Sequence, residues 1–374
     1  MDLGLNEAQQ MLQNSAREFL EAECPDTYVR AMEENERGYS PEMWTKLAEQ
    51  GWIGLTIPEQ YGGVGLTFTD LTVLLEEMGR ALLPGPFFST VVLGSQAIQL
   101  AGSDEQKSEF LPRIATGQLI VTLALTEPTG RWDAAGVETT ATPSSDGYVI
   151  NGTKLYVPNA HVSDYLVVAA RTGDAEGDVS LFIVPRSTSG VSQTLLKTIA
   201  SDRQSEVMFE NATVPASALL GELNGGWDTI ERVLQWGAVG KCAEMVGGGR
   251  QVLDITVDYA KERVQFGRPI GSFQAIQHHC SNMATEVEAS RHITFQAAAR
   301  ISDGLDAAKE VAMAKAWVND SYRRVCDLGH QCHGAIGFTK EHNMQLYSRR
   351  AKAAELMFGD SDVHLESVAQ AMGL

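Results

Sequence analysis

The stretch DYLVVAARTGDAEGDVSLFIVP, residues 164–185, has two runs of β-branched and apolar residues separated by turn-forming Gly and Asp. Runs of this composition and spacing predict two short strands joined as a hairpin. Similar runs lie on both sides of it, at 119–127, 147–152, 153–158 and 205–215. DG at 146–147 and NG at 151–152 are turn signals on either side of one strand. Together these features predict a small all-β domain over residues 118–222.

The segments before and after this region have the capping and spacing of helices. Two capping-box pairs lie in the first part of the chain, Asn6 with Gln9 and Ser103 with Gln106. In the last part, apolar and small residues recur at helical spacing, at Val311, Ala314, Val318, Ser321, Val325 and Leu328. Core packing in a helical bundle accounts for that stripe. We predict an α+β chain with a helical domain at 1–117, the β domain, and a helical bundle at 223–374.

The bulk composition limits the classes of partner. The chain has 374 residues, 44% hydrophobic content and a formal net charge of −19. This length predicts two or three packed regions, and the negative charge argues against nucleic acid or anionic membrane as the main partner. No apolar run is long enough to span a bilayer. The N-terminus MDLGLNEAQQ lacks the basic start and apolar stretch of a secretion signal, so the cytoplasm is the expected compartment.

Neither metal ligation nor a Rossmann-type nucleotide site is indicated. Five cysteines without a CxxC pair predict free thiols. The one metal candidate is the group Cys326, His330, Cys332 and His333, whose helical spacing does not bring four ligands together, so no metal is predicted. The Gly-rich loop PEQYGGVGL at 58–66 is not a GxGxxG between a strand and a helix.

Two segments carry groups that suit a ligand, although each also has a purely structural interpretation. LALTEPTG at 123–130 ends a strand in a Gly turn whose backbone N–H groups can face a ligand. RVQFGRPIGSFQAIQHH at 263–279 offers the Arg263 guanidinium for phosphate, the Phe266 ring for stacking and the Gln274 amide for a base edge. A helix break with a solvated arginine explains the second segment almost as well.

A third segment, QCHGAIGFTKEHNMQLYSRR at 331–350, adds the Gln331 amide and two glycines, Gly334 and Gly337, that allow close backbone approach. Together and in this order, the segments are specific. The chain resembles the acyl-CoA dehydrogenase family over essentially its whole length. The resemblance lies in PEQYGGVGL, ALTEP, NGTK, RVQFGRPIGSFQAIQH, QCHGAIGFTKEH and YSRRAK.

The resemblance implies a fold and a reaction. The family fold is an N-terminal helical domain, a middle β-barrel and a C-terminal four-helix bundle. The family uses FAD, an acyl-CoA thioester and usually a tetramer, passes electrons to electron-transfer flavoprotein, and serves β-oxidation of fatty acids or sterol side chains. The reaction is α,β-dehydrogenation, in which a carboxylate takes the α-proton while the β-hydride passes to the flavin. Because a thioester α-proton is weakly acidic, hydrogen-bond donors must stabilise the enolate oxygen.

In the family each FAD is shared between two subunits, so its binding residues fall into two halves. The half donated to a neighbour holds the adenine and pyrophosphate end. The residues that match it are Arg263, Phe266, Gln274, Gln331 and Gly334, while Ala335 replaces a second Gly and adds one methyl group. The resemblance therefore implies that this neighbour-facing half is intact.

The half that serves the chain's own flavin is predicted to be degraded. Leu125 and Thr126 match the family, but its Gly-Ser-Asp is here Arg-Trp-Asp at 131–133, so a small hydroxyl has become an indole. In the next strand Tyr156 keeps the aromatic position, whereas Pro158 replaces Thr or Ser and has neither the hydroxyl nor the backbone N–H. A lost donor in a buried site costs about 1–3 kcal/mol.

The family's catalytic acid is missing from both of its usual positions. Ungapped counting from YSRRAK places Phe358 at the usual Glu, and the alternative position on the first bundle helix is Gly237. Glu244 and Glu231 lie seven and six residues from Gly237, about 9–10 Å along a helix. Asp360, two residues after Phe358, is a weak candidate for a relocated base. Its structural interpretation is an N-cap of the next helix.

Three roles remain open. The chain resembles the base-lacking subunit of heteromeric bacterial acyl-CoA dehydrogenases, which would pair with a complete second subunit and complete its FAD site. Alternatively it is a self-sufficient homo-oligomer that uses Asp360 as base. For the own half-site, a separate alternative is that Arg131 makes a new phosphate contact. It could also be a same-fold flavoenzyme with other thioester chemistry, such as a desulfinase. The intact neighbour-facing half beside a damaged own half favours the partner subunit.

Overall fold

The computed structural model describes residues 4–374, which form two compact units. The helical unit comprises the described residues of Met1–Arg30, together with Phe68–Leu83 and Ala238–Leu374. The sheet unit comprises Ala31–Thr67 and Pro84–Gly237. Both are discontinuous in sequence, and the three-domain boundaries stated above remain a prediction. Within residues 4–374, no helix is long and apolar enough to cross a membrane.

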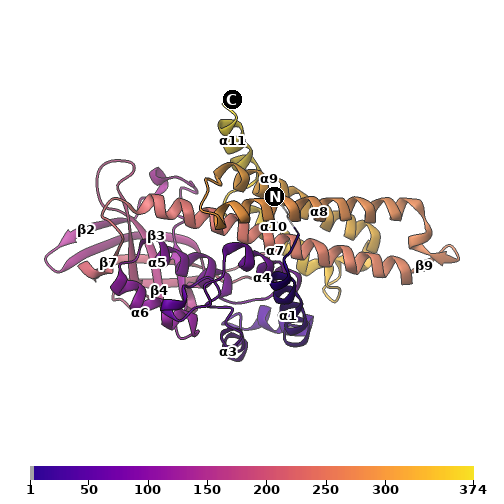
Figure 1. The fold of residues 1–374 in the computed structure, drawn as a ribbon, viewed down its shortest axis with the longest axis horizontal. Coiled ribbons are helices and arrows are strands. Elements are labelled where there is room, and N and C mark those ends of the chain that lie inside the picture. Colours follow the sequence, from indigo (N-terminus) through magenta and orange to yellow (C-terminus); the bar gives the residue numbers. More distant parts are fainter. Residues whose placement is uncertain (1–3) are drawn as a thin grey trace. The chain divides into compact units, whose positions relative to one another are not determined.

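The sheet unit is built on one eight-stranded sheet (Figure 1). Its order is β6-β7-β3-β2-β4-β5-β8, and β1 pairs in parallel with β4. β4 and β5 pair antiparallel from Tyr165 opposite Pro185 onward, which confirms the predicted hairpin. Alternate residues such as Val207 and Phe209 on β7 enter the core of the sheet. The strands are β1 (Val121–Ala124), β2 (Thr140–Ser144), β3 (Gly147–Pro158), β4 (Tyr165–Arg171), β5 (Val179–Pro185), β6 (Val191–Leu196), β7 (Gln204–Pro215) and β8 (Leu219–Leu220).

The turn predicted at NG, 151–152, was wrong. Both residues lie inside the 12-residue strand β3, where pairing with β7 shifts register between Ile150 and Gly152. Such an irregularity accommodates a residue with an unusual backbone angle, and Gly152 has φ +150°. The glycine therefore serves a bulge in a continuous strand. DG at 146–147 does join β2 to β3, as predicted.

Capping residues begin several helices in the way the sequence predicts. Asn6 and Gln9 form the capping box of α1, and Ser103 and Gln106 form that of α6. Ser40 caps α3 through the Met43 N–H. The helices of the sheet unit are α3 (Pro41–Glu49), α5 (Ser95–Ala101), which follows the π-helical segment Phe88–Gly94, and α6 (Asp104–Ala115). Two helices, α2 (Asp26–Glu34) and α7 (Gly226–Glu262), have residues in each unit.

The helical unit packs long helices closely. In the predicted stripe on α9, all members are buried except Leu328, which is half-buried. A Cβ on Gly247 of α7 would lie 1.7 Å from the Glu76 carbonyl oxygen of α4, so only glycine allows this contact. The remaining helices are α1 (Glu7–Glu23), α4 (Phe68–Arg80), α8 (Gln274–Ser302), α9 (Ala308–His333), α10 (Met344–Leu356) and α11 (Ser361–Ala371). The order of helices, sheet and helices along the chain is as predicted.

Candidate functional site

The Arg263 segment forms a short hairpin at the end of the α7–α8 pair (Figure 1). Strands β9 (Val264–Gln265) and β10 (Arg268–Pro269) pair across Phe266 and Gly267, which have φ of 53° and 78°. Positive φ at both central residues is what a type I′ turn requires. The Phe266 side chain is 93% exposed at this tip. The turn therefore presents an aromatic ring to solvent beside the exposed Arg263.

The Gln331 segment lies where α9 ends. Gly334 ends the helix with φ +64°, and a Cβ there would meet nothing within 4 Å. Gln331, Gly334 and Ala335 are exposed. The 3₁₀ segment that follows, Gly334–Phe338, exposes the large apolar side chain of Phe338 to 70%. A backbone approach to Gly334 is thus open on this surface.

An aromatic contact, missed from the sequence, brings these two segments together. Tyr259, one helical turn before Arg263, stacks on His333, the last residue of α9, with ring centroids 4.4 Å apart and 22° between planes. The Arg263 N–H donates to the Tyr259 carbonyl at 2.8 Å. Gln274 begins α8 at the same hairpin. The sequence signal was an aromatic residue four positions before Arg263.

The chemistry of this surface fits the adenosine diphosphate end of FAD. An exposed guanidinium suits a phosphate, an exposed ring suits a base, and the two exposed amides can donate or accept hydrogen bonds. The Arg263 side chain is exposed, so its donors are accessible to a ligand. All five matching residues are exposed while lying on elements of one unit.

The Leu125–Thr126 turn lies beside the end of β3 in the sheet unit. The Thr126 carbonyl accepts from the Leu155 N–H at 2.8 Å, and the Leu125 carbonyl accepts from the Lys154 ammonium at 3.2 Å. Both turn residues are half-buried. The structure thus brings the two sequence segments of the predicted own half-site together.

Glu127 and Lys154 form a buried ion pair beneath this turn. Lys154 is fully buried, Glu127 is 4% exposed, and their charged atoms lie 2.5 Å apart. The carboxylate also accepts the backbone N–H groups of Glu138 at 2.8 Å and Thr139 at 3.0 Å. Burial lowers the pKa of Lys154 to about 8, against the opposing effect of Glu127. The pair supports the turn and leaves neither group for a ligand.

The rest of the own half-site offers few donors. Tyr156 has φ 54° and is 57% exposed, but Pro158 contributes only a carbonyl, which accepts from the Thr122 hydroxyl at 2.7 Å. The Arg131 guanidinium lies 2.6 Å from the Asp133 carboxylate and lowers the pKa of that group. Because Arg131 is already paired, this geometry does not favour the phosphate contact considered above. Of the residues predicted for the own half-site, Pro158 therefore offers no donor and Arg131 is already paired.

Phe358, the predicted position of the family's acid, lies on the loop between α10 and α11. Phe358 has φ 60°, an unfavourable left-handed angle for a bulky residue, and Gly359 follows with φ 93°. The Phe358 carbonyl accepts from His364 Nε2 at 2.8 Å. The Asp360 carboxylate accepts from the Val363 N–H at 3.0 Å and caps α11, which confirms its structural interpretation. The phenylalanine is half-buried and cannot exchange a proton.

A buried lysine that sequence reasoning missed fastens this loop. Lys315 of α9 is fully buried and donates to the carbonyls of Ala354 at 3.1 Å and Gly359 at 3.2 Å. It also donates to the Asn319 side chain at 2.6 Å. A cation here satisfies carbonyls left free at the end of α10. The signal was a lysine adjacent to Ala314 in the apolar stripe.

The alternative acid position also lacks a carboxylate. Gly237 lies within α7 and is buried. Of the two nearest glutamates on that helix, Glu231 accepts from the Trp227 indole N–H at 2.7 Å, and Glu244 is paired with Lys241. Each carboxylate therefore has a partner of its own close by.

Asp360→Asn is expected to leave both stability and any acyl-CoA turnover unchanged, because asparagine also caps helices. Asp360→Ala is expected to lower the free energy of unfolding by about 1 kcal/mol through loss of the cap. Urea unfolding and single-turnover assays measure the two effects. A loss of turnover in Asp360→Asn of about 100-fold or more would instead identify Asp360 as a base.

The stability of the chain is expected to depend on pH through Lys315. Burial lowers its pKa in the folded state from 10.5 to about 8, so the unfolded state binds more protons between those values. Relative to Lys315→Met, the wild type should therefore gain stability as the pH rises from 8 toward 10.5. Urea unfolding at several pH values measures the difference. Lys309→Met, at an exposed position, should show a flat difference, and a flat difference for Lys315→Met would contradict the prediction.

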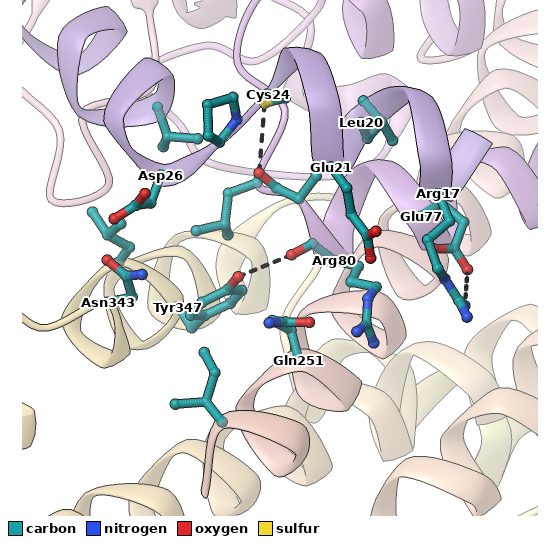
Figure 2. Close-up of a pocket in the computed structure, with 16 residues that line it drawn as sticks. Arg17, Leu20, Glu21, Cys24, Asp26, Glu77, Arg80, Gln251, Asn343 and Tyr347 are labelled. Atoms are coloured by element: carbon teal, nitrogen blue, oxygen red, sulfur yellow. Dashed lines mark hydrogen bonds and ion pairs between the residues drawn. The ribbon is translucent and has the colours of Figure 1, made fainter. Parts of the chain in front are cut away.

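A separate cavity of about 320 Å³ lies within the helical unit (Figure 2). It is lined by side chains from α1, α2, α4, α7 and α10 and includes none of the predicted site residues. Its charged walls are largely satisfied internally: Arg17 pairs with Glu77 at 2.6 Å, and the Tyr347 hydroxyl donates to the Arg80 carbonyl at 2.9 Å. The lining therefore gives no clear preference for one ligand charge.

The cysteines and histidines of the chain form no metal site within residues 4–374. All five cysteines are free. His330 and His333, considered above as ligands, instead make aromatic contacts near the Gly334 segment, on Phe338 and Tyr259 respectively.

Comparisons with known proteins agree with this architecture. Models of the acyl-CoA dehydrogenase N-terminal, middle and C-terminal domains match residues 6–118, 122–212 and 224–373. The caffeyl-CoA reductase–Etf complex subunit CarC of Acetobacterium woodii is 31% identical, over 96% of this chain and 96% of that protein. Butyryl-CoA dehydrogenase from Megasphaera elsdenii has a TM-score of 0.92 at 28% identity, covering 100% of both chains. A chain of the ChsE4–ChsE5 complex from Mycobacterium tuberculosis has a TM-score of 0.91 at 27% identity, covering 100% of this chain and 99% of that one.

Proposed function

The chain belongs to the acyl-CoA dehydrogenase family, and on this premise we propose that it is the base-lacking subunit of a heteromeric acyl-CoA dehydrogenase. It completes the FAD site of a second, catalytically complete subunit that oxidises an acyl-CoA thioester. The observation that carries the proposal is Phe358, a residue without an acidic proton at the predicted position of the family's acid, on a loop whose Phe358 and Gly359 carbonyls accept from His364 and Lys315.

The contrast between the two half-sites supports this assignment. A chain that had simply lost its function would be expected to lose both halves alike. Here the neighbour-facing half keeps Arg263, Phe266 and Gln274 exposed on a rigid hairpin and helix start. The own half has Pro158 where a donor is needed and a paired Arg131. The chain is thus better suited to a neighbour's cofactor than to its own.

Each neighbour-facing residue has a distinct part in binding. Arg263 neutralises phosphate charge, Phe266 stacks on the adenine, and the Gln274 and Gln331 amides fix its orientation. Gly334 leaves room for the pyrophosphate beside the backbone. Bound FAD would supply the hydride acceptor for α,β-dehydrogenation, and the second subunit would supply the carboxylate for the α-proton.

The names of two relatives support a second subunit and an electron-transfer flavoprotein as partners. ChsE4–ChsE5 is named as a complex, and CarC is named as a subunit of a caffeyl-CoA reductase–Etf complex. By analogy we assign this chain to a heterotetramer with a homologous subunit, with electron-transfer flavoprotein as electron acceptor. The substrate class is an acyl-CoA thioester from fatty acid or sterol side-chain β-oxidation.

A self-sufficient homo-oligomeric dehydrogenase is the second candidate. Asp360 favours it by lying two residues from the acid position, although its carboxylate caps α11. A same-fold flavoenzyme with other thioester chemistry would not need an α-base. It would still need the donors that Pro158 and residues 131–133 do not supply.

The proposal is tested by purifying the chain alone and together with a candidate second subunit of the same family. We expect the lone chain to carry little or no FAD, and the complex to carry one FAD per pair of chains. Acyl-CoAs should bleach the flavin absorbance of the complex only. Stoichiometric FAD that is bleached by acyl-CoA in the lone chain would reject the partner-subunit proposal.

A further inference from the structure

Three histidines lie together beneath the exposed Gly334 segment of the helical unit. His330 stacks on Phe338, with ring centroids 4.3 Å apart. His333 stacks on Tyr259 and meets His342 edge-on at 4.8 Å. His330 and His333 are 8% and 4% exposed. We call His330, His333 and His342 the histidine cluster.

The hydrogen bonds of the cluster define its neutral tautomers. His333 Nδ1 faces the Gly329 carbonyl at 2.8 Å, so Nδ1 carries the proton. The Ser348 hydroxyl donates to the Met344 carbonyl and therefore accepts from His330 Nε2. His342 Nδ1 accepts from the Met344 N–H at 3.2 Å. These bonds fix which nitrogen of each ring carries the proton in its neutral form.

The two buried rings each leave one nitrogen without a hydrogen-bond partner in the described part of the chain, His333 Nε2 and His330 Nδ1. A proton added to either would create a buried N–H without an acceptor and a charge beside other imidazoles. Burial lowers the pKa of all three histidines, with a smaller contribution from their mutual repulsion at His330 and His342. Proton uptake is therefore costly while the segment stays packed.

Few charged groups act on the cluster from the elements around it. Asp327 on α9 favours the charged form of His330, whereas Arg30 on α2 opposes that of His342. α7 contributes the phenol of Tyr259, and α10 contributes only the Ser348 hydroxyl. One carboxylate does not neutralise three imidazoles.

The Tyr259–His333 stack is also the contact that joins the two cofactor-facing segments. Tyr259 precedes Arg263 by one helical turn and accepts its N–H, while His333 immediately precedes Gly334. A Cβ on Gly337 would lie 3.1 Å from both His330 Nδ1 and His333 Cβ, so the segment is packed on the cluster. Movement of His333 would therefore change the spacing between Arg263 and Gly334.

We propose that His333 is a positioning residue that holds the Arg263 and Gly334 segments at the spacing that a dinucleotide needs, and that proton uptake by the histidine cluster releases this hold. The proposal rests on the proposed function for the identity of the ligand, FAD. The histidine cluster and its contacts lie within this chain, so the proposed pH response does not depend on a partner subunit. At acid pH, below the ordinary histidine pKa of 6.5, the Gly334 segment loosens and the neighbour's FAD is released faster.

Hydrogen exchange of the purified chain tests the device without any cofactor. Between pH 7.5 and 5.5, after correction for intrinsic rates, protection of amides 334–343 should fall about tenfold more than that of α8 amides. His333→Phe keeps a ring on Tyr259 but cannot take up a proton, and it should lose this extra dependence. His292→Phe, at an exposed position on α8, should retain it. His342→Phe, at a half-buried position, provides a second variant if His333→Phe does not fold.

The contribution of the Tyr259–His333 stack is tested by Tyr259→Ala, which should lower protection of amides 334–343 at both pH values. Tyr259→Phe should restore that protection. In the heteromeric complex, FAD release followed by flavin fluorescence should accelerate about tenfold from pH 7.5 to 5.5, and less in His333→Phe. Equal protection at both pH values, or unchanged pH dependence in both His333→Phe and His342→Phe, overturns the inference. A complex that holds no FAD at any pH rejects the proposed function. In that case hydrogen exchange still tests whether the histidine cluster controls the Gly334 segment.

Discussion

Arg263→Ala is expected to weaken FAD binding by the heteromeric complex by about 10- to 100-fold. A hydrogen bond to a charged group contributes about 1.5–3 kcal/mol, and each 1.4 kcal/mol corresponds to a factor of ten. Arg263 is exposed beside the hairpin tip, and its backbone N–H is already bonded to the Tyr259 carbonyl. The substitution should therefore remove the phosphate contact without disturbing the fold. Titration of apo complex with FAD, followed by flavin fluorescence, measures the change.

Arg131→Ala is the matched control for this prediction. Its guanidinium is exposed and paired with Asp133, on the half-site that the chain would use for its own flavin. We expect less than about a threefold change in FAD affinity, since the Arg131 guanidinium is occupied by Asp133 and exposed ion pairs contribute little. If Arg131→Ala weakens binding and Arg263→Ala does not, the chain uses its own half-site and the partner-subunit proposal is wrong.

Lys154→Met is expected to lower the free energy of unfolding by about 3–5 kcal/mol. The variant leaves the Glu127 carboxylate buried with only the N–H groups of Glu138 and Thr139 to stabilise its charge. Because Lys154 also donates to the Leu125 carbonyl, the turn at the end of β1 should loosen as well. Urea unfolding monitored by circular dichroism measures the loss.

Two further variants separate charge burial from lost packing. Adding Glu127→Gln to Lys154→Met removes the buried charge and keeps an acceptor for the two amides, so at least about 1 kcal/mol should return. Lys197→Met, at an exposed position in the sheet unit, should change stability by less than about 0.5 kcal/mol. A loss for Lys154→Met no larger than that of Lys197→Met would show that the buried pair contributes little.

Much of the fold follows from short-range patterns in the sequence. The hairpin of residues 164–185 and the capping boxes at Asn6 and Ser103 depend on residues close together in the chain, and both were predicted correctly. The NG at 151–152 was not, because local residues allow a turn while pairing with β7 makes a bulge in a continuous strand. Register with a distant strand decides between those two outcomes.

The residues of the candidate site could likewise be predicted from the sequence. The contacts that hold them in place could not. Counting along the chain placed Phe358 where the family has its acid, and identified Arg263, Gln331 and Gly334 as cofactor residues. Their roles remain predictions. The Lys315 bonds to Ala354 and Gly359 were not predicted, because they join residues about 40 positions apart.

The sequence by itself determined the order of helices, sheet and helices and the family, and it predicted the absence of a carboxylate at the acid position. Those properties depend on residue identity and on spacing within one element. Only the tertiary structure decided that Tyr259 stacks on His333, that Glu127 is neutralised by Lys154, and that Lys315 fastens the Phe358 loop. Such contacts depend on which distant elements pack together, and the burial that makes them strong is a property of the whole fold.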